Sequence, residues 1–286
     1  MKSTRREFLN RSALGLTAAA CAGNIAGILR ADPLGFPIGC QTWPVRDQIG
    51  KDFDGTLRKL AGMGYQRIEM CSPPGYAGAG FGSLVNMKAS EMRQRIEAAG
   101  VGCESCHYGF RELKEHLDDR LAFAKDLGLR QMIVATFALP AGATLADWGK
   151  AAADLNHIGE QTQKAGIQLG FHNHEFEFHE IDGVLIYDKL MEALDPKVIK
   201  MQFQVAVIDL GYKASTYLRK YPGRFLSMHL ADWSPDAKRT VAVGSGIVDW
   251  KDTFEAAKVG GIKNYFVETD ADAYAASYAY LHGLSV

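Results

Sequence analysis

Two histidines and two glutamates fall within nine residues of one segment, GFHNHEFEF, which runs from Gly170 to Phe178. Imidazole nitrogens and carboxylate oxygens are the groups that hold divalent metals and transfer protons in enzymes. The segment is therefore a candidate metal site or acid–base site, and the alternative is a polar strand end with no chemistry. Which of these holds depends on the face of the strand that each side chain occupies.

Short apolar segments alternate with amphipathic helical segments along most of the chain. Segments at 52–64, 90–100, 114–128 and 144–166 have helical spacing and end in glycine, as a helix C-cap does. Eight segments have the pattern of buried strands: 36–43, 65–71, 101–108, 130–137, 167–174, 199–207, 225–232 and 263–270. This order predicts an α/β fold, a single-domain (β/α)8 TIM barrel over residues 32–286. The rival, a doubly wound open sheet, would carry a phosphate-binding glycine turn after the first strand, and GCQTWPVRD is not one.

Alternation along the strand at 167–174 places its histidines inside the barrel. The apolar side chains of one parity should face the helices, namely Ile167, Leu169 and Phe171. His172 and His174 have the opposite parity and should point inward near the carboxyl end of the strand. Barrel enzymes keep their catalytic groups at that end.

The same test on the next strands gives a set of polar side chains that converge on one mouth: His172, Gln204, His229 and Glu268. Such a layer is unfavourable in a low-dielectric rim unless it binds something. Imidazole and carboxylate groups suit one divalent metal, and we expect all four residues to be its ligands. A lone inward histidine would more often be a satisfied core residue, but several converging polar groups favour a site.

Further candidates surround this set. Glu69 also has inward parity and His107 ends the third strand, and we expect both to bind substrate together with His174. Trp43, at the end of the first strand, is either a platform for a sugar ring or part of the barrel packing. Glu177 lies beyond the strand end, where alternation no longer fixes the face, so it is either a second acid–base group or a non-functional loop residue.

Residues 1–31 are predicted to be a twin-arginine signal peptide. STRREFL, at 3–9, precedes an apolar run of small residues; the alternative is a basic helix N-terminus. We therefore expect export to the periplasm. A lipid anchor at Cys21 is not expected, because AAAC is a poor lipobox. Removing these residues takes away five lysines and arginines and one glutamate, so the net charge changes from −1 to −5.

Neither charge suggests nucleic acid or an anionic membrane as a partner. Four cysteines remain after residue 31: Cys40, Cys71, Cys103 and Cys106. The last two form CESC within a predicted strand, where residues three apart face opposite ways. We therefore expect free thiols rather than a shared metal.

Several segments resemble the xylose-isomerase-like barrel superfamily, the sugar phosphate isomerase/epimerase group, over residues 36–270. They are GCQTWPVRD, GFHNHEFEF, YLRKYPGRFLSMHLADW, VAVGSGIVDW and YFVETD. The resemblance implies one divalent metal (Mn, Co, Zn or Mg) held by Glu, Asp, His and Glu on strands five to eight. His229 and Glu268 match the last two positions, whereas His172 and Gln204 replace the first two. Because the amide of Gln204 supplies no charge, weaker metal binding than in the family is expected.

The resemblance further implies an isomerase or epimerase in which the metal stabilises an enediolate. Glu268 would be the base and Glu177 a second acid–base group. Export and the missing phosphate-binding turn favour a small non-phosphorylated sugar or keto-sugar. Two alternatives stay open: a metal-dependent sugar lyase or dehydratase, and a non-catalytic carbohydrate-binding barrel with a degenerate metal site. Cleavage of abasic DNA is excluded by the acidic charge and the sparse ligand set, whereas a homo-oligomer stays open.

Overall fold

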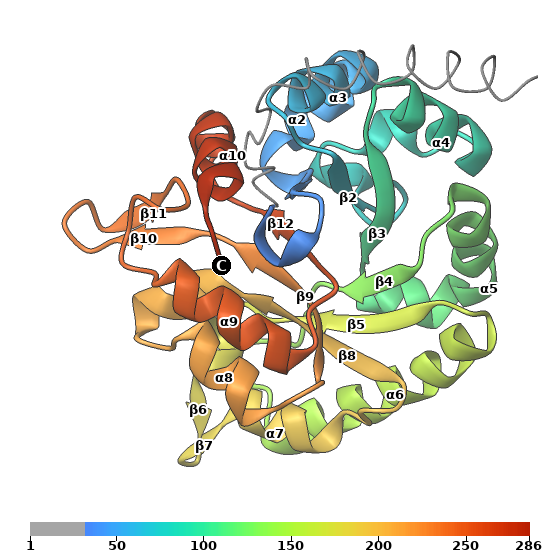
Figure 1. Cartoon of the computed structure of the whole chain (residues 1–286). Helices are drawn as coiled ribbons and strands as arrows, with labels where there is room; N and C mark the ends of the chain where they lie inside the picture. Colours follow the sequence, from blue (N-terminus) through green and yellow to red (C-terminus); the bar gives the residue numbers. More distant parts are fainter. Residues whose placement is uncertain (1–31) are drawn as a thin grey trace, which may run out of the picture. The chain divides into compact units, whose positions relative to one another are not determined.

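Eight parallel strands close into a barrel in the computed structural model, which describes residues 32–286 (Figure 1). Their order around the barrel is β1-β12-β9-β8-β5-β4-β3-β2. The strands are β1 (Gly39–Gln41), β2 (Arg67–Cys71), β3 (Gly102–Tyr108), β4 (Gln131–Val134), β5 (Gln168–His172), β8 (Ile199–Gln204), β9 (Phe225–Leu230) and β12 (Asn264–Val267). The predicted (β/α)8 barrel is confirmed, and the predicted signal peptide lies outside the described residues.

Helices surround the ring of strands in Figure 1. They are α2 (Arg46–Lys51), α3 (Phe53–Gly62), α4 (Ala89–Ala98), α5 (Phe110–Leu127), α6 (Leu145–Lys164), α7 (Ile186–Ala193), α8 (Ala214–Lys220), α9 (Trp250–Gly260) and α10 (Tyr274–Gly283). The four predicted helical segments correspond to α3, α4, α5 and α6. Short 3-10 turns follow several strands: η2 (Trp43–Val45), η5 (Phe176–Phe178), η6 (Val205–Leu210) and η7 (Ala271–Ala273).

Local sequence signals explain where these helices begin and end. Thr144 starts α6 with a capping box, in which Asp147 Oδ2 accepts the backbone N–H of Thr144 over 2.8 Å. Gly128 ends α5 with a φ of +89°, a left-handed conformation that favours glycine. The apolar face of α6 is buried against the strands through side chains such as Trp148 and Leu155.

The main core lies between strands and helices. Leu169 and Phe171 are fully buried in it, as the alternation along β5 predicts. Phe203 on β8 packs against Tyr187 of α7 and Tyr217 of α8, with ring centroids 5.9 and 5.7 Å apart. Burying an aromatic side chain of this kind stabilises the fold by about 1.5–3 kcal/mol.

Two strand irregularities break the simple alternation. Between β8 and β9 the register shifts, so that Met201 pairs with Phe225 but Gln202 pairs with Ser227. Leu226 consequently lies inside the barrel beside Gly170, where a Cβ would be 3.0 Å from Leu226 Cδ2. Strict alternation from Met228 and Leu230 would instead place Leu226 against the helices, and the register shift prevents this.

The second irregularity lies between β2 and β3, where Ile68 pairs with Cys103 but Glu69 pairs with Ser105. The extra residue brings Cys103 to the same side as Cys106, and both pack against the main core. The expectation that these two side chains face opposite ways is wrong for that reason. The expectation of free thiols is confirmed for the four cysteines of the described region.

Two short hairpins extend beyond the barrel: β6 (Glu180–Ile181) with β7 (Val184–Leu185), and β10 (Asp232–Ser234) with β11 (Arg239–Val241). The second hairpin follows β9 and places Thr240 at the mouth of the barrel. Within residues 32–286, none of the helices combines the length and apolar character needed to cross a membrane.

Candidate functional site

A cavity of about 570 Å³ opens at the carboxyl ends of the barrel strands. Most of the predicted site residues line it: Trp43, His107, His172, His174, Gln204 and Glu268. Small side chains leave room around them, among them Ala206 and Ala231. The alternation of the strands therefore brings these residues together at one mouth, as parallel barrel geometry requires.

Three hydrogen-bonded ionisable side chains, Glu268, His229 and Glu69, extend from the cavity into the barrel interior. Glu268 Oε2 lies 2.8 Å from Nδ1 of His229, and the other ring nitrogen of His229 lies 2.5 Å from Oε2 of Glu69. The side chains of His229 and Glu69 are fully buried, whereas that of Glu268 is 17% exposed. His229 thus links a carboxylate at the cavity to a carboxylate beneath it.

Glu69 is surrounded by hydrogen-bond donors from the barrel interior. Oε2 accepts from Gln41 Nε2 at 2.7 Å as well as from His229. Oε1 accepts from Ser105 Oγ at 2.5 Å and from Gln202 Nε2 at 2.9 Å. Glu69 therefore lies below the cavity and is satisfied by the protein itself, although we expected it to bind substrate.

These contacts determine the charge of the side chains of His229 and Glu268. Burial by itself lowers the pKa of His229, but Glu268 and Glu69 outweigh it and raise that pKa to about 10. Burial raises the pKa of Glu268, and His229 more than offsets this, so the pKa is lowered overall. At neutral pH, and with no cation bound, His229 is an imidazolium between two carboxylates.

Gln204 is held by three contacts. Its Nε2 donates to Glu268 Oε2 over 2.6 Å, and its Oε1 accepts the backbone N–H of Ala206 over 3.2 Å. Its own backbone N–H donates to Asn173 Oδ1. The amide therefore turns its nitrogen, not its oxygen, toward the carboxylate of Glu268.

Three imidazoles meet at the floor of the cavity. His107, His172 and His229 each offer one ring nitrogen, and these atoms lie within 4.8 Å of one another. Nδ1 of His172 is buried and has no hydrogen-bond partner among residues 32–286. Burial, with the neighbouring histidines, lowers the pKa of His172 well below its usual value, so the ring is neutral and one of its two nitrogens has a lone pair. An orphaned imidazole nitrogen beside two more imidazoles fits a transition-metal cation.

Glu177 and His174 lie on the loop after β5. Glu177 is fully buried and does not line the cavity; its Oε2 accepts the backbone N–H of His174 over 2.7 Å. Burial raises the pKa of Glu177 to about 8 and lowers that of His174 to about 4. The structure thus places His174 in the cavity wall and Glu177 behind it.

Alternation along the strands did not reveal two residues of the cavity wall, Arg46 and Tyr76. The guanidinium of Arg46 lies 4.4 Å from the ring centroid of Trp43, and Tyr76 meets the same ring edge-on at 5.8 Å. Arg46 is the first residue of α2 and Tyr76 lies in the loop after β2, and the alternation of the strands extends to neither position. The half-buried Trp43 ring is thereby fixed as one wall of the cavity.

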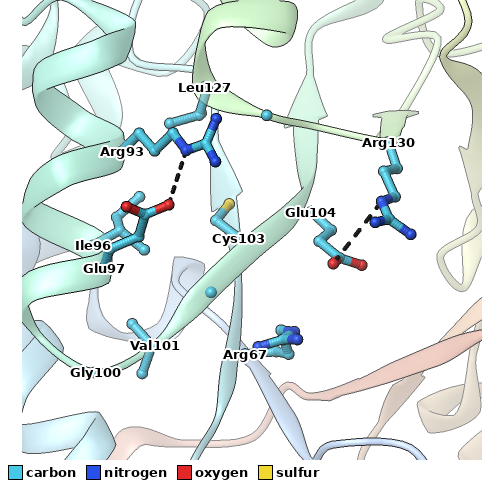
Figure 2. Close-up of a pocket in the computed structure, with 12 residues that line it drawn as sticks. Arg67, Arg93, Ile96, Glu97, Gly100, Val101, Cys103, Glu104, Leu127 and Arg130 are labelled. Carbon is cyan, nitrogen blue, oxygen red and sulfur yellow. Dashed lines mark hydrogen bonds and ion pairs between the residues drawn. The ribbon is translucent and has the colours of Figure 1, made fainter.

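A second cavity, of about 530 Å³, lies at the amino ends of β2 and β3 (Figure 2). Figure 2 shows Arg93 paired with Glu97 and Arg130 facing Glu104, with N–O distances of 2.8 and 4.0 Å. It lies at the opposite ends of the strands from Glu268 and holds no histidine. We assign it no part in catalysis.

Comparison with known proteins agrees with this fold. Residues 57–281 match the model of the xylose isomerase-like TIM barrel family, and the chain belongs to that family. A sugar phosphate isomerase/epimerase from Parabacteroides distasonis ATCC 8503 superposes with a TM-score of 0.72 at 23% identity, covering 91% of this chain and 97% of that one. This likeness concerns the fold.

Curated relatives match over shorter stretches. An inosose dehydratase of Bacillus cereus (strain AH820) is 28% identical over 30% of this chain, and the chain spans only 28% of that relative. An inosose dehydratase of Geobacillus thermodenitrificans (strain NG80-2) is 24% identical over 42% of this chain and 46% of its own length.

Two structural relatives contain metals. The IOLI protein, with a bound zinc, superposes with a TM-score of 0.61 at 12% identity, covering 87% of this chain and 94% of that one. A barrel from Mycobacterium smegmatis in complex with magnesium gives 0.62 at 14% identity, covering 88% and 97%. Metals therefore occur among relatives of this fold, and this chain brings three imidazoles together at the floor of its cavity.

Proposed function

We propose that this protein is a sugar isomerase or epimerase that removes a proton from the carbon next to a carbonyl group of a non-phosphorylated sugar or keto-sugar. The observation that carries the proposal is the placement of Glu268. Its carboxylate reaches the cavity while His229 and Gln204 bind the same oxygen atom, Oε2, at 2.8 and 2.6 Å. A carboxylate held in this way is ionised at neutral pH and is a suitable general base.

The other residues of the cavity have separate tasks in this proposal. Trp43 supplies an apolar face for the sugar ring, and His174 supplies hydrogen bonds to its hydroxyl groups. His174 is neutral in this setting, so it can donate one hydrogen bond and accept another. A divalent cation at the imidazole cluster would stabilise the negative charge that develops on the enediolate oxygens.

We assign Glu177 the role of the second acid–base group, on the side of the sugar opposite Glu268. It is protonated at neutral pH because of its raised pKa, so it can donate a proton. Reaching the sugar requires a movement of the loop that carries His174, because the carboxyl group lies behind that residue. Return of the proton to the neighbouring carbon gives isomerisation, and return to the same carbon from the other face gives epimerisation.

A sugar dehydratase or lyase is the second candidate. It is favoured by the relatives named inosose dehydratase. Both reactions begin with the same proton abstraction by Glu268. They differ in whether a hydroxyl or glycosidic oxygen then leaves the adjacent carbon.

The first experiment is exchange of a sugar C–H for deuterium, followed by NMR in D₂O with free and keto-modified sugars. Exchange that disappears in Glu268→Gln supports the proposal, and the products separate isomerase from lyase. Binding of sugars without any exchange would contradict it and favour a non-catalytic carbohydrate-binding barrel.

We also propose that the protein acts in the periplasm after twin-arginine export. The support is the STRREFL pattern at residues 3–9. Replacing both arginines, Arg5 and Arg6, by lysines in the full chain should retain the protein in the cytoplasm. Continued export of that variant would contradict the proposal.

A further inference from the structure

The hydrogen bonds beneath the cavity determine which nitrogen of His107 is available. Gln202 Nε2 faces the Glu69 carboxylate at 2.9 Å and Ser227 Oγ at 3.0 Å. Because a carboxylate only accepts, the NH₂ group of Gln202 must lie on that side, and its Oε1 must face His107 Nε2 at 2.7 Å. The His107 ring therefore carries a proton on Nε2, which leaves the lone pair of a neutral ring on Nδ1.

Glu69 imposes the same arrangement on His229. Its Oε2 accepts from Nε2 of His229 at 2.5 Å, and it lies 3.1 Å from Nε2 of His107. A buried carboxylate or amide on the outer nitrogen of a histidine is the usual device that fixes a metal-binding tautomer. Nδ1 of His229 is then the atom available to a cation, with Glu268 Oε2 beside it at 2.8 Å.

From these contacts we infer that the metal of this barrel is held by His107, His172 and His229, with Glu268 as the fourth ligand, and that Gln204 is not a ligand. His107 thereby changes from a substrate-binding residue to a ligand. Glu69 is the positioning residue that aims two of the rings. The inference rests on the metal of the proposed function, and it names the residues that hold it.

The contacts of Gln204 exclude it from the set of metal ligands. Its oxygen, the only atom of the amide that can bind a cation, accepts the N–H of Ala206, and its nitrogen donates to Glu268. Metal binding by the three imidazoles does not require the amide of Gln204 to rotate. It also gives the buried Nδ1 of His172 a partner, which this atom lacks within the described part of the chain. Nitrogen donors favour zinc or cobalt over magnesium.

The test measures binding of the ion alone, without turnover. The full chain is stripped with chelator and titrated calorimetrically with Zn²⁺ and Co²⁺. The wild type should bind one ion per chain, His107→Ala should weaken binding at least about 100-fold, and Glu69→Gln about 10- to 100-fold. Gln204→Ala should stay within about threefold of the wild type, because it removes no ligand. His157→Ala, which changes an exposed histidine, is the matched control.

A measurement on the unaltered protein covers the case in which a variant fails to fold. With ¹⁵N-labelled histidine, zinc should shift the ring nitrogens of three histidines, and the shifted atoms should be Nδ1. Loss of the ion in Gln204→Ala together with full binding in His107→Ala would overturn the inference, as would a wild type that binds no ion. Because neither measurement involves a sugar, failure of deuterium exchange would refute the proposed reaction and leave the ligand assignment standing.

Discussion

The side chain of Gln204 donates from Nε2 to Glu268 Oε2 over 2.6 Å. The resemblance found in the sequence implies an aspartate at this position. The uncharged amide of Gln204 does not attract a cation, but its hydrogen bond holds the carboxylate of Glu268 in place. We therefore expect weaker metal binding than with an aspartate at this position, and an ionised Glu268. This relationship leads to the first prediction.

Gln204→Asp should raise the affinity for Zn²⁺ or Co²⁺ by at least about tenfold, or about 1.4 kcal/mol. The new carboxylate adds a negative charge beside the cation site. In the absence of metal the same change should lower the thermal midpoint, because two carboxylates then face each other. Calorimetric titration and thermal unfolding with and without metal measure both effects, and Gln48→Asp at an exposed position is the control. Unchanged affinity would show that charge at this position does not act on the ion.

Glu268→Gln should reduce turnover by about 10²- to 10⁴-fold, because an amide cannot accept the proton. The change preserves volume and can still contact His229 and Gln204, so the fold should persist. Deuterium exchange measures the turnover, and circular dichroism checks that the fold persists. Glu180→Gln, at an exposed position, should leave exchange unaltered. Exchange at the wild-type rate in Glu268→Gln would remove this residue from the mechanism.

Trp43→Ala should raise KM for the sugar about tenfold and change kcat by less than about threefold. The ring forms a wall of the cavity and makes no hydrogen bond to Glu268 or His229, so we expect it to contribute binding in ground and transition states alike. Steady-state kinetics separate the two constants. A loss confined to kcat would mean that Trp43 acts on the reacting carbon and not as a platform.

Glu177 should make stability depend on pH. Burial raises its pKa from 4.5 to about 8, so between these values the folded protein binds a proton that the unfolded chain releases. The free energy of unfolding from this group is therefore greatest below pH 4.5 and falls as the pH rises toward 8. Each pKa unit corresponds to about 1.4 kcal/mol, so the total effect is on the order of a few kcal/mol.

Glu177→Gln should accordingly remove this slope and be more stable than the wild type at pH 8. The amide oxygen can still accept the N–H of His174. Urea unfolding at pH 5, 6, 7 and 8 gives the comparison, with Glu175→Gln at an exposed position as the control. Equal slopes in wild type and Glu177→Gln would mean that the carboxyl group is ionised throughout.

Asp232→Ala should lower the free energy of unfolding by about 3 kcal/mol. This buried carboxylate accepts from Gly244 N and Trp250 Nε1 at 2.9 Å, and from two further backbone N–H groups at 2.9 and 3.1 Å. Removing it leaves buried donors unpaired. Thermal and urea unfolding measure the loss, and Asp236→Ala on the exposed turn of the same hairpin should have little effect. A difference below about 0.5 kcal/mol would show that water replaces the carboxylate.

The sequence alone determined the barrel and the inward side of most of the cavity. Side chains of a parallel strand alternate between two environments, so the apolar parity of Leu169 and Phe171 settles where His172 and His174 point. The same reasoning located His229 and Glu268. These results depend only on local periodicity, which a single chain displays directly.

Only the tertiary structure determined the side-chain directions that do not follow from alternation along a strand. The bulges that turn Leu226 inward and bring Cys103 to the side of Cys106 arise from the register between strands. Arg46 begins α2 and Tyr76 lies in the loop after β2, so the direction of their side chains depends on the closure of the whole barrel.

The state of each polar group also depends on partners distant in the chain. Glu69 lies 160 residues from His229, and Gln202 lies 95 residues from His107. Alternation along the strands predicted that Glu69 and His229 share the barrel interior. Only the folded geometry specifies which atom of each ring is protonated, because hydrogen bonds act over about 3 Å and strand order sets which groups come that close.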